Sequence, residues 1–251
     1  MSIKHAPILL ALMLPLIPAC ASPAFEIEPR YWFPGFELEA LVEEDDIGTK
    51  IDFDNDLGMD DENFAGGRIK WFTGDDSWIR IDYVPIEYDG DNVLTRRIDF
   101  NGETYTVGSR VVSEFNLEYG RLGWGWQFID IDDCVKLGGL LEAKIFNLET
   151  EIATANGLID EKEDFVFGLP TIGATLDVNP IDEVNIFAEL SGITAGSYGY
   201  MYDAEAGVKF IPIDNVTVTG GYRIVKFDIE AGDNEAMMKL NGPFVGVSVR
   251  F

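Results

Sequence analysis

Acidic side chains on alternate residues form the pattern in this sequence that most resembles a binding site. Asp54, Asp56 and Asp60 are spaced in steps of two around Gly58, and carboxylates arranged in this way suit Ca²⁺. Counted from Asp52, however, the glycine is the seventh residue and the twelfth is asparagine, whereas an EF-hand loop has glycine sixth and glutamate twelfth. A weak Ca²⁺ site and an ordinary solvated acidic loop are therefore both open interpretations.

Catalysis that depends on a histidine is not expected, because the sequence has no histidine after the first few residues. The one histidine is His5, so no Ser–His, Cys–His or Asp–His pair can form further along the chain. Cys20 and Cys134 are far apart and neither belongs to a CxxC motif, which disfavours zinc, haem and iron–sulfur sites. We expect a non-enzymatic protein with no resident cofactor, although catalysis by carboxylates alone stays open.

The composition limits the class of partner. The chain has 251 residues, 45 of them acidic and 18 basic, with a net charge of −27, and hydrophobic residues make up 47% of it. So acidic a chain lacks the basic surface that replaces phosphate counterions, so nucleic acid is not an expected partner. The apolar share is too high for a disordered chain, and the length suits one domain.

The first two dozen residues have the pattern of a secretory signal peptide. Lys4 precedes an apolar run over 6–17, and small residues follow it. A membrane-spanning helix needs about twenty apolar residues, so this run is too short to be one. We expect residues 1–24 to be a cleaved signal peptide and residues 25–251 to be a single domain. In the alternative interpretation, the segment 17–20 is a lipobox and Cys20 is lipidated.

The rest of the chain alternates apolar and polar residues with a period of two, which predicts strands with two different faces. Short turns alternate with longer polar connections such as 43–63 and 88–110, as in an up-and-down meander. In the second of these connections, Asn101-Gly102 predicts a hairpin. We predict ten strands, with eight or twelve as alternatives: 25–42, 64–73, 78–88, 110–129, 135–148, 164–178, 184–192, 199–211, 216–229 and 238–251.

Two architectures produce this alternation. A soluble barrel turns its apolar face inward, whereas a membrane barrel turns it toward lipid and keeps polar residues inside. The predicted strands reach the length of about 9–11 residues that a tilted spanning strand needs. Aromatic residues such as Tyr31, Trp71, Trp124 and Tyr200 gather near strand ends, where the membrane interfaces would be. These features favour the membrane barrel over a soluble periplasmic lipid-binding barrel.

The last strand carries the one local motif that points to a family. Val245, Val247, Val249 and Phe251 alternate with small or polar residues, and this segment resembles the C-terminal assembly signal of bacterial outer-membrane barrels. The chain is similar to small outer-membrane β-barrel proteins of the OmpA, OmpW and OmpX kind. That resemblance implies an all-β, transmembrane, antiparallel up-and-down barrel. It also implies a place in the bacterial outer membrane, with the barrel-assembly machinery, outer-membrane lipid and lipopolysaccharide as partners.

The polar face of the predicted barrel collects charges of both signs. A ten-strand barrel is only slightly wider than the eight-strand size that side chains fill, so an ion-pair network should largely plug the lumen. A narrow, porin-like channel for small solutes is the alternative. The predicted lumen residues are Arg68, Lys70, Arg80, Asp82, Glu114, Glu118, Lys136, Glu142, Lys144, Glu189, Asp203, Glu205, Lys209 and Arg223.

Two details do not fit a regular barrel strand. Pro29, Pro85 and Pro170 fall inside predicted strands, so they should lie near rims or bulges. Around Gly120-Arg121 the apolar residues change from odd to even positions, which predicts a β-bulge.

The expected role follows from these features. We expect a monomeric structural or interaction barrel that acts through acidic extracellular loops. A lipid-modifying outer-membrane enzyme is a weaker alternative, because such enzymes typically use a histidine that this chain lacks beyond residue 5.

Overall fold

The computed structural model describes residues 24–41, 49–100, 103–155, 157, 159–196, 199–231 and 234–251. Residues 1–23, and with them Cys20 and nearly all of the predicted signal peptide, lie outside this part. No helix among the described residues is long and apolar enough to cross a membrane. The strands are β1 (Phe25–Trp32), β2 (Gly35–Leu41), β3 (Ile51–Asp52), β4 (Phe64–Phe72), β5 (Ser77–Val93), β6 (Ile98–Phe100), β7 (Glu103–Tyr105), β8 (Arg110–Ile131), β9 (Val135–Thr154), β10 (Asp160–Ile181), β11 (Val184–Thr194), β12 (Gly199–Ile213), β13 (Val216–Ala231) and β14 (Asn234–Arg250).

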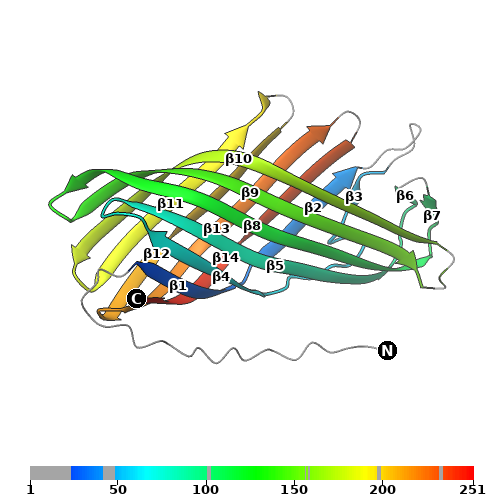
Figure 1. Cartoon of the computed structure of the whole chain (residues 1–251). Coiled ribbons are helices and arrows are strands. Elements are labelled where there is room, and N and C mark those ends of the chain that lie inside the picture. The colour runs from blue at the N-terminus through cyan, green and yellow to red at the C-terminus, as the bar shows by residue number, and fades with distance from the viewer. Residues whose placement is uncertain are drawn as a thin grey trace.

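Ten antiparallel barrel strands close into a ring (Figure 1). β4, β5 and β8–β14 pair in sequence order, and β1 pairs with both β4 and β14 to close the barrel. β1 and β2 count as one barrel strand, because β14 pairs with β1 as far as Trp32 and with β2 from Gly35. The predicted meander and its ten strands are confirmed.

The first barrel strand is interrupted at Phe33 and Pro34. Proline has no N–H to donate to the ladder, and the Phe33 N–H donates instead to the Pro243 carbonyl at 3.0 Å. Here the two strands approach very closely, since a Cβ at Gly242 would lie 1.9 Å from the Phe33 carbonyl oxygen. Position 242 therefore accepts only glycine without a shift of the backbone.

The three prolines inside strands lie where one side of the strand is unpaired. The β1–β14 register skips residues 28 and 29, at Pro29. Pro85 lies beyond Tyr83, the last β5 residue that pairs with β4, and Pro170 precedes Ile172, the first β10 residue that pairs with β11. A missing N–H donor is tolerated at such edges.

The barrel has two zones that differ in which face is apolar. Near the short turns, an apolar band covers the outside of the barrel. Beyond this band the strands continue toward the long connections, and we call this part of the barrel the outer extension. Its charged residues lie outside and its aromatic residues lie inside. Tyr83 and Glu118, whose Oη and Oε1 atoms lie 3.2 Å apart, mark the change. The apolar band includes Ile81, Leu122, Trp124, Leu141, Ile172, Val208 and Val245, all well exposed.

The outer extension is built from two facing groups of strands. One consists of β5, β8, β9 and β10, which reach furthest to the right in Figure 1, and the other of β13, β14, β2 and β3. Between them lies an apolar core. Its members include Phe36, Phe64, Tyr88, Phe115, Tyr119, Phe146, Val225, Phe227 and Leu240, all buried.

The predicted β-bulge at Gly120-Arg121 is wrong. β8 pairs with β5 and β9 without a shift there, and its irregularity lies at 127–129. The alternation of faces is unbroken, but the surroundings change. Phe115 points into the core of the outer extension, whereas Leu122 points out from the apolar band. Along this regular strand, the apolar residues lie on the inner face in the outer extension and on the outer face in the apolar band. In the sequence this looks like a one-residue shift of the period of two.

Two further predictions concern the hairpin in the second long connection and the ends of the strands. Ile98 and Tyr105 pair across β6 and β7, which confirms the predicted hairpin; the turn residues 101–102 lie outside the described part. Several strands are longer than predicted, because the outer extension continues them in a polar-outside pattern. β5 ends at Val93 and β10 begins at Asp160.

Candidate functional site

Inside the apolar band, charged side chains form one continuous ion-pair network. Six are basic and six are acidic, so the network is neutral as a whole. They come from β1, β4, β5, β8, β9, β11, β12 and β13, so the network ties most of the barrel wall together. The members are Arg30, Arg68, Arg80, Arg121, Lys144 and Arg223 with Glu28, Asp82, Glu142, Glu189, Asp203 and Glu205.

Arg121 lies at the centre of the network. Its guanidinium nitrogens are 2.9 Å from Asp203, 3.1 Å from Asp82, 3.8 Å from Glu189 and 3.9 Å from Glu205. The side chain is 2% exposed. Charges this deeply buried lose their hydration, and only close, hydrogen-bonded partners offset that cost.

Asp203 is the carboxylate with the most donors around it. Arg223 lies 2.8 Å from its Oδ2, Lys144 lies 3.3 Å away, and the Tyr119 hydroxyl donates to the same oxygen at 2.8 Å. The neighbouring Glu205 binds Arg68 at 2.8 Å and also pairs with Arg30. These contacts cross the lumen from β12 to several other strands, so the network fills the interior rather than only covering the wall.

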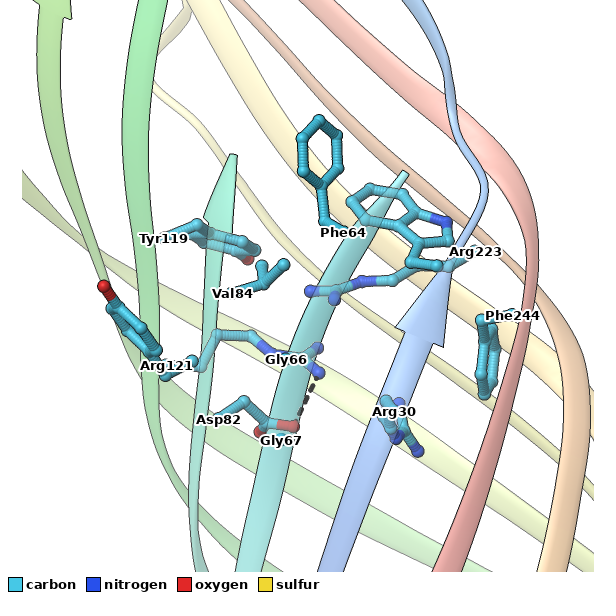
Figure 2. Close-up of a pocket in the computed structure, with 12 residues that line it drawn as sticks. Arg30, Phe64, Gly66, Gly67, Asp82, Val84, Tyr119, Arg121, Arg223 and Phe244 are labelled. Carbon is cyan, nitrogen blue, oxygen red and sulfur yellow. Dashed lines mark hydrogen bonds and ion pairs between the residues drawn. The ribbon is translucent and has the colours of Figure 1, made fainter. Parts of the chain in front are cut away.

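A small cavity of about 20 Å³ remains next to the network (Figure 2). Figure 2 shows Arg30, Arg121 and Arg223 around it, with the Arg121–Asp82 pair drawn as a dashed line and Phe244 on one side. Such a volume holds about one water molecule and is too small for a solute. This cavity therefore offers no room for a solute beside the network.

Above the network, apolar side chains fill the lumen of the outer extension. Phe36 and Tyr88 stack with ring centroids 3.9 Å apart, and Phe115 lies against both rings. The described part of the predicted acidic loop folds inward over this core. Four of its side chains, which we call the apolar plug, are almost fully buried: Ile51, Phe53, Leu57 and Met59. Met59 also bridges to Gly90 of β5.

The structure places the three carboxylates of the predicted Ca²⁺ site in different surroundings. Asp54 and Asp60 are exposed, while Asp56 binds Arg96, with Nε 2.8 Å from Oδ1. Partial burial raises the pKa of Asp56, but the hydrogen bonds from Arg96 and from the Asp52 N–H outweigh this effect and lower it. Among the described residues, no three acidic, histidine or cysteine side chains are grouped so that they could hold a metal ion.

Most of the predicted lumen residues do face the lumen. Arg68, Arg80, Asp82, Glu142, Lys144, Glu189, Asp203, Glu205 and Arg223 belong to the network. Lys70, Lys136 and Lys209 line a separate cavity on the short-turn side of it. Glu114 and Glu118 are exceptions and are exposed on the outside. They lie in the outer extension, where the outer face meets water and takes the charges.

Sequence analysis missed three members of the network: Glu28, Arg30 and Arg121. The first two alternate with the outward-facing Ile27 and Tyr31, so the period of two was a usable signal for them. Arg121 was hidden by the bulge that we predicted beside it. Without a bulge, Leu122 and Trp124 face outward at even positions, so Arg121 at an odd position faces the lumen.

The C-terminal motif lies at the seam where the barrel closes. Val245 pairs with Tyr31 of β1, and the Phe251 carbonyl accepts hydrogen bonds from the Ala24 and Phe25 N–H groups at 3.0 and 2.9 Å. Val245 and Val247 are about half exposed on the apolar band. The last strand therefore completes the ring.

Comparisons with known proteins agree with this architecture. No family model and no curated protein matches the chain. Among solved structures, the outer membrane protease OmpT from Escherichia coli superposes with a TM-score of 0.60 at 9% identity, over 91% of this chain and 97% of OmpT. This is the fold of bacterial outer-membrane β-barrels. The β domain of the Bordetella autotransporter BrkA has a TM-score of 0.48 at 11% identity, over 92% of this chain and all of that domain.

The outer-membrane barrel fold explains the two zones. Lipid covers the outside of such a barrel over a band about 25 Å tall, where apolar side chains are required. Beyond that band the wall is surrounded by water, so the usual arrangement of a soluble β-protein returns, with apolar residues inside. Inside the apolar band the lumen thus holds charged side chains, and beyond the band it holds the apolar core.

Proposed function

We propose that this protein is a non-enzymatic, monomeric outer-membrane barrel with a closed lumen, which acts through the acidic outer face of its extension. The observation that carries the proposal is the double closure of the lumen. The ion-pair network crosses the lumen from one side of the barrel to the other, and the apolar plug fills the lumen at the end that carries the long connections. A solute would have to displace both layers.

The outer face of the extension is an acidic surface carried by strands rather than by loops. On neighbouring strands, Asp89 lies opposite Glu114, and Glu114 lies opposite Glu151. Burial raises the pKa of Glu114, which lies outside the apolar band, and the nearby Glu151 and Asp89 raise it further. Like charges in register destabilise a sheet, so this arrangement favours a partner that brings positive charge. Divalent cations that bridge to lipopolysaccharide fit that requirement.

An enzymatic role has less support from the residues. OmpT is a protease, and its likeness to this chain is one of fold at 9% identity. The only histidine of this chain is His5, far in sequence from the outer extension. On the outer face, Asp91 pairs with Arg110, Glu149 pairs with Lys162, and Glu118 accepts hydrogen bonds from Tyr83 and Asn147. None of these contacts places a serine, threonine or cysteine beside a base.

Single-channel recordings in planar bilayers test the closed lumen. Purified protein that has inserted, as shown by protease protection and a heat-modifiability gel, should leave the membrane electrically silent. Discrete conductance steps that depend on the inserted protein would contradict the closed lumen and favour a narrow channel for small solutes.

The apolar band makes a separate prediction about membrane location. Leu141→Arg, in the middle of the outward face of β9, should lower the free energy of unfolding in lipid vesicles by about 2–4 kcal/mol, because it places a charge in the hydrocarbon. Glu151→Arg is the matched control, since it lies on the same strand and face but beyond the band, and should cost nothing. Equal effects of the two substitutions would show that lipid does not surround the band.

A further inference from the structure

A cavity of about 290 Å³ lies inside the barrel on the short-turn side of the ion-pair network. Basic side chains outnumber acidic ones in its wall, although the whole chain has a net charge of −27. The charged lining residues are Lys70, Lys136, Lys209 and Arg250 with Glu26, Glu28 and Asp177.

Lys70 is the basic residue of this wall that forms no ion pair with the described carboxylates. Arg250 lies 2.8 Å from Glu26, Lys136 lies 3.1 Å from Asp133, and Lys209 lies 3.5 Å from Asp177. Among the described residues, no carboxylate forms an ion pair with Lys70, whose Nζ lies 5.9 Å from the centre of the Trp78 ring. Lys209 is close enough for the two ammonium groups to repel each other. Asp177 lies near Lys209, and Glu26, opposite Lys70 on β1, attracts Lys70 from beyond ion-pair distance. An anion between the two ammonium groups would relieve their repulsion.

Hydrogen-bonding groups line the same cavity. Thr219 is 1% exposed and Ser248 is 3% exposed, and both line its wall. Thr219 lies directly opposite Lys209 on the neighbouring strand. The buried indole N–H of Trp78, another lining residue, lacks an acceptor among the described residues. Buried polar groups in proteins are nearly always hydrogen-bonded, so these groups can donate hydrogen bonds to a ligand in the cavity.

We propose that the cavity binds a small free molecule through a phosphate or carboxylate group, held by Lys70 and Lys209 with the hydroxyls of Thr219 and Ser248. Its volume is near the lower end of the range for small-molecule sites, which fits a compact anion and excludes a lipid with its chains. Because the network closes the lumen above it, the cavity is a blind pocket that opens at the short-turn end. In the proposed membrane orientation this end faces the periplasm.

Calorimetric titration of the folded barrel in detergent tests the site. Inorganic phosphate and citrate are the two free-anion probes, and a short-chain phosphatidic acid is the lipid probe. We expect saturable binding of at least one free anion. Lys70→Met should weaken that binding at least tenfold, and Lys70→Arg should retain it because the charge remains.

Lys239→Met is the matched control, since Lys239 pairs with Glu37 away from the cavity and should leave anion binding unchanged. A heat-modifiability gel reports whether each variant is folded; if Lys70→Met fails that check, Lys209→Gln takes its place. No saturable binding of either free anion, equal binding by the Lys70→Met and wild-type proteins, or binding of the lipid probe alone would overturn the proposal. The conductance recordings do not depend on the cavity. Conductance through the lumen would contradict the proposed function, and a lack of anion binding would contradict only the proposed site.

Discussion

Replacing Arg121 with methionine is expected to lower the free energy of unfolding of the barrel by about 3–5 kcal/mol, because it removes one partner from several buried ion pairs. Asp203 and Asp82 lie 2.9 and 3.1 Å from the guanidinium, and neither can reach bulk water at this depth. Methionine has a similar length, so loss of packing contributes little. Urea titration of the refolded protein in lipid vesicles, followed by tryptophan fluorescence, measures the change.

Arg110→Met is the matched control for this substitution. Arg110 makes a two-pronged pair with Asp91, with nitrogen–oxygen distances of 2.7 and 2.5 Å, but both side chains are about half exposed on the outer extension. Water solvates the carboxylate that remains, so we expect the unfolding curve to stay in place. If the two substitutions destabilise the barrel equally, water reaches the network, and the interpretation of the lumen as closed is wrong.

The sequence predicts the strands and the faces of this barrel well, because both depend on a local period of two. Asp203 and Glu205 were placed inside correctly, since Tyr202, Ala204 and Ala206 alternate with them without interruption. The number of strands followed from the alternation of short turns and long connections. The pairing partners of each strand then follow from the meander alone.

The period does not reveal what surrounds each face, and this accounts for the errors. Glu118 and Leu122 are on the same face of β8, but one is beyond the apolar band and the other is within it. The assumption that all polar faces point inward therefore misplaced Glu114 and Glu118. The inward fold of the loop was missed for another reason: Phe53 and Leu57 are separated by Asp54, Asn55 and Asp56, so the apolar residues of the loop form no run long enough to predict a strand.

The second large effect is expected in the core of the outer extension. Phe146→Ala should lower the free energy of unfolding by about 3–5 kcal/mol, the usual cost of removing a buried aromatic ring. Phe146 is 0% exposed, and its ring stacks on Tyr119 at 4.7 Å and on Phe167 at 4.8 Å, with Phe227 at 5.9 Å in an edge-on contact. The same denaturant titration measures the loss.

Phe165→Ala is the control for Phe146→Ala. It also removes an aromatic residue from the β9–β10 hairpin, but one that lies outside the core. Phe165 is 65% exposed, and its ring centre is 5.4 Å from that of Phe167, so its removal should change the free energy of unfolding by no more than about 0.5 kcal/mol. Because Phe146 also holds Tyr119, which donates to Asp203, Phe146→Ala should loosen the network from above. A small effect of Phe146→Ala would mean that the outer extension is not packed as a core and that the lumen is closed only by its charges.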